Sequence, residues 1–279
     1  MIKIPDSYNY IAAFLTLNCN LNCSYCINKH NAINPRKLLT GYQWVTALNN
    51  IQSRLDLPIT LQGGEPSLHP DFYHILNNID PVLNIDLLTN LTFNIYEFMD
   101  KVNPGRLKRN APYASIRVSY HPDFMEVITL TNRVFLMKER GYSVGIWGLD
   151  HPEHKEDNAI ISKICKYKGI DFRLKEFLGW YNGKLYGSYR YEGACDGAVS
   201  SKKHLCKTSE LLIAPDGKVF PCHAHLYRDN YSIGNIDNFT LKEIYYPCEE
   251  YGTCNPCDVK VKTNRFQEYG HTSVEIKEI

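Results

Sequence analysis

The sequence predicts an α/β fold with a parallel sheet over its first 178 residues, followed by a smaller cysteine-rich segment. Up to about Phe177, short runs rich in β-branched and aromatic residues alternate with longer amphipathic runs. This alternation favours a parallel sheet with right-handed crossovers, either an open doubly wound sheet or an incomplete barrel. Later the chain becomes rich in Tyr, Gly and Cys. We therefore expect a domain boundary near residue 178.

The predicted elements follow one another in a regular order. Strands are expected at 11–17, 58–62, 85–89, 114–120, 143–148 and 171–177. Helices are expected at 40–55, 71–79, 95–102, 123–140 and 155–168. Thr40 and Asp123 are suited to cap helix N-termini, and Gly141 follows the longest helix, where left-handed backbone is favoured. In such a sheet the functional side chains gather at the carboxyl ends of the strands.

Charge and hydropathy limit which partners the protein can be expected to bind and in which cellular compartment it is expected. The formal net charge is +1, which gives no general attraction to nucleic acid or to an anionic membrane. There is no apolar run long enough to span a bilayer, and the N-terminus lacks the features of a secretory signal. We therefore expect a cytoplasmic protein. Its ten cysteines then indicate metal binding or redox chemistry, since disulfides are rare in that compartment.

Three of the cysteines come directly after the first predicted strand. Cys19, Cys23 and Cys26 lie within eight residues, so their thiolates can bind three irons of a [4Fe–4S] cluster. Such a cluster usually takes four cysteines, and three leave one iron open to a small molecule. The alternative is a structural zinc site with His30 as fourth ligand, although zinc ligands usually come in pairs.

The spacing C-x3-C-x2-C, with the aromatic Tyr25 before the last cysteine, resembles the radical S-adenosylmethionine (SAM) superfamily. The resemblance implies that SAM chelates the open iron through its amino and carboxylate groups. Reductive cleavage would give a 5′-deoxyadenosyl radical, which abstracts a hydrogen atom from the substrate. It also implies a partial (β/α)6 barrel, similar to a TIM barrel, for residues 1–178.

Further residues resemble SAM-binding elements of this family. Gly63-Gly64-Glu65-Pro66 is similar to its GGEP element, which implies contact with the SAM amino group. Asn90 ends the third strand and Ser119 ends the fourth, where the family binds SAM with polar groups. Ile146 would pack on adenine, or equally be ordinary core, because its stretch lacks the first glycine and the glutamate of the family's GxIxGxxE pattern.

The C-terminal cysteines suggest a second metal site. Cys206 and Cys222 flank a predicted β-hairpin with a turn at 215–217. With Cys254 and Cys257 they supply four thiolates, enough to close one site. A zinc ribbon is the alternative interpretation.

The Gly-x4-Cys form that ends at Cys222 resembles the SPASM and twitch extensions of radical SAM enzymes. The resemblance implies an auxiliary [4Fe–4S] cluster in a small α+β extension covering residues 179–279. Cys195 and Cys248 are the alternative ligands for this cluster.

The resemblance predicts a radical SAM oxidoreductase that abstracts hydrogen with help from the auxiliary cluster. We expect a small polar metabolite of the alcohol or sugar type as substrate, because no separate peptide-recognition domain precedes Cys19. A maturase acting on a ribosomal peptide is the first alternative, and a non-enzymatic zinc-ribbon protein that binds nucleic acid is the second. The enzyme would need an electron donor such as flavodoxin or ferredoxin, and neither membrane nor nucleic acid is expected as a partner.

Overall fold

A computed structural model describes residues 1–27, 37–262 and 271–279. One nine-stranded sheet forms its centre, in the order β14-β13-β12-β2-β4-β5-β6-β7-β8. Its six neighbouring parallel strands are β2 (Tyr10–Thr16), β4 (Ile59–Gly63), β5 (Ile85–Thr89), β6 (Ile116–Ser119), β7 (Val144–Asp150) and β8 (Asp171–Glu176). All six strands predicted from the sequence are therefore confirmed, and their parallel pairing is confirmed as well.

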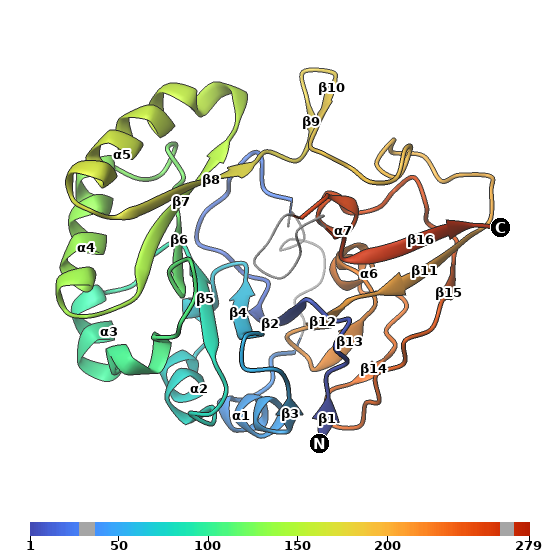
Figure 1. Ribbon diagram of the computed structural model, residues 1–279, viewed down its shortest axis with the longest axis horizontal. Coiled ribbons are helices and arrows are strands. Elements are labelled where there is room, and N and C mark those ends of the chain that lie inside the picture. Colours follow the sequence, from blue (N-terminus) through green and yellow to red (C-terminus); the bar gives the residue numbers. More distant parts are fainter. Residues whose placement is uncertain (28–36, 263–270) are drawn as a thin grey trace.

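Five helices connect these strands and cover one side of the sheet (Figure 1). They are α1 (Gly41–Asn49), α2 (Phe72–Asn78), α3 (Ile95–Lys101), α4 (Val127–Glu139) and α5 (Lys155–Tyr167). Three 3-10 turns begin with proline: η1 (Pro66–Leu68), η2 (Pro104–Leu107) and η3 (Pro152–His154). Large side chains such as Trp44 and Phe98 are fully buried between helices and sheet. This burial of apolar surface is the main force that holds the layers together.

Of the three residues predicted to mark helix boundaries, two are confirmed and one is wrong. Thr40 forms a capping box with Gln43, and Gly141 has a positive φ of 87°, so both predictions are confirmed. Asp123 is not a cap: Glu126 accepts hydrogen bonds from the first-turn amides of α4 instead. That helix therefore begins at Val127, four residues later than expected.

The first predicted helix also ends early. It was expected to reach residue 55, but α1 ends at Asn49. The chain then forms β3 (Ile51–Gln52), which pairs in parallel with β1 (Ile2–Lys3). The buried side chains of Ile2 and Ile51 hold this small sheet against the core.

The C-terminal segment extends the central sheet instead of standing apart from it. β12 (Glu210–Ile213) pairs in parallel with β2 and antiparallel with β13 (Lys218–Phe220), which in turn pairs with β14 (Gly234–Asn235). The predicted hairpin is thus confirmed. The sheet continues past the boundary predicted at residue 178, and the division into 1–178 and 179–279 stays a prediction.

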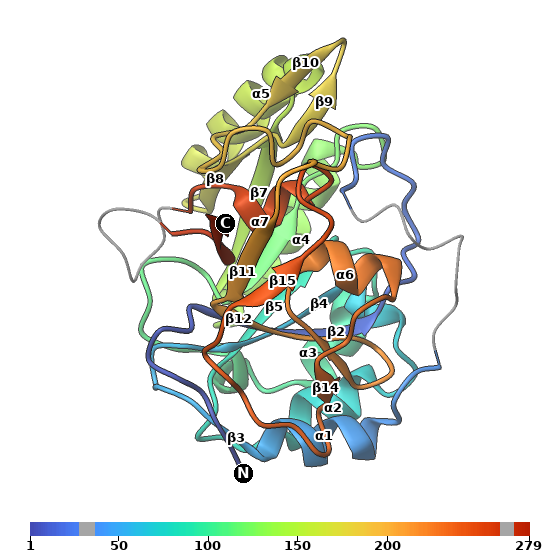
Figure 2. The same cartoon turned by 90° about the vertical axis from the view of Figure 1, so that its right-hand side faces the viewer.

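The remaining elements lie on the side of the parallel strands that the five helices leave uncovered (Figures 1 and 2). A three-stranded sheet combines β15 (Tyr246–Cys248), β11 (His204–Thr208) and β16 (Val274–Glu278). A hairpin of β9 (Gly179–Tyr181) and β10 (Lys184–Tyr186) follows β8, and two short helices are α6 (His223–Arg228) and α7 (Pro256–Val259). Over the described part of the chain, no helix is both long and apolar enough to cross a membrane.

Candidate active site and auxiliary cysteine site

A cavity of about 1310 Å³ lies at the carboxyl ends of the parallel strands. The strands and the C-terminal segment both contribute to its wall. The residues predicted from the sequence that line it are Cys19, Cys23, Tyr25, Cys26, Gly63, Gly64, Asn90 and Ser119. The fold therefore brings most of the predicted cofactor-binding residues to one site.

The three early cysteines lie close together on this wall. The amide of Cys26 donates a hydrogen bond to the Cys23 carbonyl at 3.2 Å, which closes a tight turn. Burial, together with the neighbouring Cys26 and Cys19 thiols, raises the pKa of Cys23 to about 11. Thiolates crowded in this way gain stability when they bind iron, and soft sulfur ligands suit iron–sulfur clusters. This donor set fits a cluster with three protein ligands; His30 lies outside the described residues.

Gly63 and Gly64 are required for a packing reason that the sequence did not reveal. A Cβ atom on Gly63 would lie 1.9 Å from the Thr16 carbonyl oxygen, and one on Gly64 would lie 2.1 Å from the Asn18 carbonyl oxygen. Both glycines let the end of β4 approach the backbone that leads into Cys19. The two glycines of the GGEP element thus support the cysteine loop in addition to lining the cavity.

Glu65 has a carboxylate that is only 1% exposed and is held by neighbouring donors. Its Oε1 accepts hydrogen bonds from the Ser67 amide, the Ser67 hydroxyl and the Thr89 hydroxyl, and its Oε2 accepts one from the Asn90 amide at 2.7 Å. Oε2 retains capacity for one further donor, such as an ammonium group. Glu65 and the buried Pro66, which begins η1, do not themselves line the cavity.

A group of aromatic rings beside the cysteine loop was largely missed by sequence reasoning. The Tyr25 hydroxyl lies 3.1 Å from Nδ1 of His121, and the two rings stack. His151 and His154 also pack against Tyr25, with ring centroids 5.4 and 5.6 Å away. His121 Nδ1 is 3.5 Å from the Cys23 sulfur. The only sequence signal was that His121 follows a strand end.

Ile146 does not occupy the position that the resemblance implied. Its side chain is fully buried in the core between sheet and helices, and its neighbour Trp147 lines the cavity instead. Successive side chains of a strand point to opposite faces, so Ile146 and Trp147 cannot both face the cavity. The expectation that Ile146 packs on adenine is corrected to the core role that the sequence left open.

A second, apolar pocket brings four cysteines together: Cys206, Cys222, Cys248 and Cys254. The thiols of Cys206 on β11 and Cys248 on the adjacent β15 lie close enough to perturb each other, which raises the pKa of Cys206 and lowers that of Cys248 to about 7. No three His, Cys, Asp or Glu side chains of the described residues converge closely enough to hold a single metal ion. A four-iron cluster does not need such convergence, because each thiolate binds a separate iron. Four thiols around one pocket fit that group.

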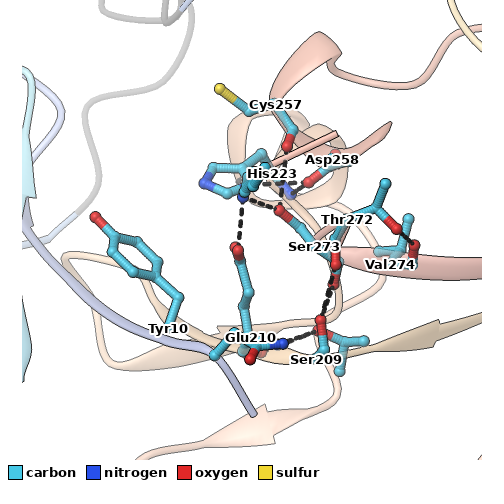
Figure 3. Close-up of polar contacts among 12 residues, drawn as sticks. Tyr10, Ser209, Glu210, His223, Cys257, Asp258, Thr272, Ser273 and Val274 are labelled. Carbon is cyan, nitrogen blue, oxygen red and sulfur yellow. Dashed lines mark hydrogen bonds and ion pairs between the residues drawn. The ribbon is translucent and has the colours of Figure 1, made fainter. Parts of the chain in front are cut away.

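Cys257 departs from the expected ligand set, because it lines the large cavity and is absent from the cysteine pocket. The Asn255 side chain caps the start of α7 at the Cys257 amide, and the Ser273 hydroxyl donates to the Cys257 carbonyl at 3.1 Å. Asp258 accepts from the amide of His223 at 2.8 Å, which fixes α7 against α6 (Figure 3). Cys248, an alternative in the sequence analysis, lines the cysteine pocket instead.

Comparison with known proteins gives matches for the C-terminal segment and for longer stretches of the chain. Residues 206–258 match the SPASM family, described as an iron–sulfur cluster-binding domain. An AdoMet-dependent heme synthase of Methanosarcina barkeri is 30% identical over 39% of this chain and 32% of its own length. A PqqA peptide cyclase of Ruegeria pomeroyi is 22% identical over 88% of this chain and 78% of its own length. The chain thus spans about a third of the heme synthase and most of the cyclase.

The structure of Streptococcus suis SuiB bound to the precursor peptide SuiA shares the fold, with a TM-score of 0.58. That match covers 83% of this chain and 63% of SuiB at 14% identity. The SPASM match includes all four cysteines of the second pocket, and the three-cysteine loop lies at the carboxyl ends of the parallel strands. The chain is thus similar to radical SAM enzymes, its residues 206–258 match the SPASM domain, and both findings support SAM and iron–sulfur clusters as its cofactors.

Proposed function

We propose that this enzyme is a maturase that modifies a peptide. The size of the cavity, about 1310 Å³, carries the proposal, since sites for single small ligands usually measure about 300–1,000 Å³. A cofactor can therefore share the cavity with a second sizeable ligand. The relative that aligns along most of both chains is named a peptide cyclase, and SuiB is a peptide-bound neighbour in fold.

The alcohol or sugar substrate expected from the sequence receives no support from these relatives. That expectation rested on the position of Cys19 near the start of the chain, which does not determine the substrate. The zinc-ribbon alternative is set aside because the matched domain is an iron–sulfur cluster-binding domain and the relative is an enzyme. A peptide substrate therefore replaces the small metabolite as the preferred interpretation.

The proposed roles of the residues follow from their positions. When bound, the cluster and SAM supply the electron and the group that abstracts hydrogen. Cys19, Cys23 and Cys26 would hold the first cluster within a partial (β/α)6 barrel. Gly63, Gly64, Asn90 and Ser119 would surround SAM, with Glu65 reaching its amino group through Oε2.

The auxiliary cluster is assigned to the second pocket. We propose the ligands Cys206, Cys222, Cys248 and Cys254, in an extension that begins near residue 179. An electron donor such as flavodoxin or ferredoxin and a cytoplasmic location remain parts of the proposal.

Turnover with deuterated substrates tests the proposed substrate class. The reconstituted enzyme would be given SAM, dithionite and deuterated peptides from the short reading frames that flank its gene. Label in 5′-deoxyadenosine, together with a mass loss in the peptide, would support a maturase. Label transfer from aminocyclitol or sugar alcohols, with none from the peptides, would restore the small-metabolite alternative.

A further inference from the structure

The large cavity has a marked excess of positive charge on the side formed by β6, β8 and the C-terminal segment. Its lining contains two carboxylates, Glu176 and Glu210, and more cationic side chains than carboxylates. The cationic side chains are Arg117, Lys175, Lys260 and Lys262. A cavity of this composition attracts anionic groups.

Three of these cations are already paired. Lys260 lies 3.1 Å from Glu176, and Lys262 lies 2.6 Å from Glu210. Figure 3 shows Glu210 below Cys257. The Lys262 ammonium also donates a hydrogen bond to the Ser273 hydroxyl. Arg117 lies 3.2 Å from the buried Asp86, which additionally pairs with Arg109. These contacts leave the three cations with carboxylate partners of the protein itself.

Lys175 is the exception. It lies near the end of β8 and lines the cavity, and among the described residues it has neither an ion pair nor a side-chain hydrogen bond. Burial, with Arg117 and Lys260 nearby, lowers the pKa of Lys175 to about 8. The side chain of Lys175 is half-buried, and an ammonium group that is partly withdrawn from water and faces other cations is stabilised when an anion binds beside it.

We propose that Lys175 binds a carboxylate of the substrate, such as the side chain of an acidic residue or the C-terminus of a peptide. The lysine presents one compact charge with three donors, which suits a single carboxylate. This inference rests on the proposed peptide substrate and adds that the peptide carries a negatively charged carboxylate where it meets Lys175. Carboxylate chemistry at this point has a second source, the carboxylate of SAM, and the experiment must separate the two.

Acylation of lysines, mapped by mass spectrometry on the SAM-loaded holoenzyme, tests the inference without turnover. Glutarate is the probe and glutaramide its uncharged match, while Lys163, exposed on α5, is the control within the same digest. Glutarate should lower the acylation of Lys175 about tenfold relative to Lys163, as expected for a charge-assisted hydrogen bond. Glutaramide should have no effect.

Equal acylation of Lys175 with and without glutarate would overturn the proposal. So would stronger protection by inorganic phosphate than by glutarate, which would indicate a phosphoryl group. Protection by SAM alone, with a loss of SAM affinity in Lys175→Gln and its recovery in Lys175→Arg, would assign the lysine to the cofactor and remove it from the substrate site. Since no turnover is measured, failure here leaves the peptide proposal intact, and failure of peptide turnover leaves this result intact.

Discussion

The carboxylate of Glu65 accepts a hydrogen bond from the backbone amide of Asn90 at 2.7 Å. This bond joins the turn after β4 to the turn after β5, and Asn90 in turn donates to the Asn20 side chain at 2.8 Å within the cysteine loop. Three motifs that are separate in the sequence therefore form one hydrogen-bonded unit. A change at Glu65 should be felt at Cys19 although Glu65 does not line the cavity.

Glu65→Gln tests this unit. The amide NH₂ of glutamine would face an N–H or O–H donor where the carboxylate now accepts, so at least one buried donor loses its partner. We expect the free energy of unfolding to fall by about 1–3 kcal/mol, with weaker SAM binding. Chemical denaturation and equilibrium SAM binding measure the two effects, and wild-type values for both would contradict the arrangement.

Cys23→Ala should abolish SAM cleavage because the first cluster loses a ligand. Iron content should fall from about eight atoms per chain toward about four, if both clusters are [4Fe–4S]. Cys165→Ala is the matched control, since Cys165 is fully buried in the core and lines neither pocket. Equal 5′-deoxyadenosine formation by wild type and Cys23→Ala, with dithionite present, would exclude the assigned role.

Two single substitutions distinguish Cys248 from Cys257 as the fourth ligand of the auxiliary cluster. Cys248→Ala should lose the auxiliary cluster, with its iron and its electron paramagnetic resonance signal, whereas Cys257→Ala should keep both. Uncoupled SAM cleavage should persist in Cys248→Ala, because the first cluster is intact. The reverse pattern, with iron lost only in Cys257→Ala, would return the fourth place to Cys257.

Gly63→Ala should destabilise the protein by about 3 kcal/mol or more, because backbone must move to relieve the contact with Thr16. Gly183→Ala offers a control that also has a positive φ, 74° against 149° at Gly63, and a Cβ there would meet nothing within 4 Å. It should cost only about 1 kcal/mol. The midpoint of thermal unfolding should be clearly lower for Gly63→Ala than for Gly183→Ala. Equal midpoints would show that the close approach to Thr16 does not affect the free energy of unfolding.

Carboxylate binding at Lys175 should depend on pH. The pKa of Lys175 in the free protein is lowered to about 8, so protection by glutarate should hold below pH 8 and weaken as the ammonium deprotonates above it. The nearby Cys257 has a pKa raised to about 11, and that of His121 is lowered to about 4. Arg117 and Lys260 also face Lys175. Protection that does not change between pH 7 and 9 would contradict the assignment.

The strands and most helices could be predicted because their signals are local. Alternating apolar runs gave all six parallel strands, and the Thr40 cap is formed by residues three positions apart. The early end of α1 was hidden because β3 exists only through its pairing with β1, almost fifty residues away. Likewise, Glu126 caps α4 although Asp123 is the residue type that usually occupies an N-cap, so the sequence pointed to the wrong residue.

The residues of the site also divide into those with a local sequence signal and those whose position depends on distant strand pairing. Spacing identified Cys19, Cys23 and Cys26, since all three lie in one loop. Cys248 could not be chosen over Cys257, because its position depends on the pairing of β15 with β11. Nor could the sequence show that Lys175 has no ion-pair partner within 1–27, 37–262 and 271–279, since this depends on which carboxylates neighbouring strands supply to other cations.

The parallel pairing of β2 with β12 has a consequence for electron transfer. β2 leads into the Cys19 loop, and β12 lies between Cys206 and Cys222 along the chain, so backbone hydrogen bonds link the supports of both cysteine groups. Because these hydrogen bonds leave no hinge between the two supports, they fix the distance over which an electron would tunnel between the two metal centres. Electronic communication between them should consequently persist while the substrate enters and leaves.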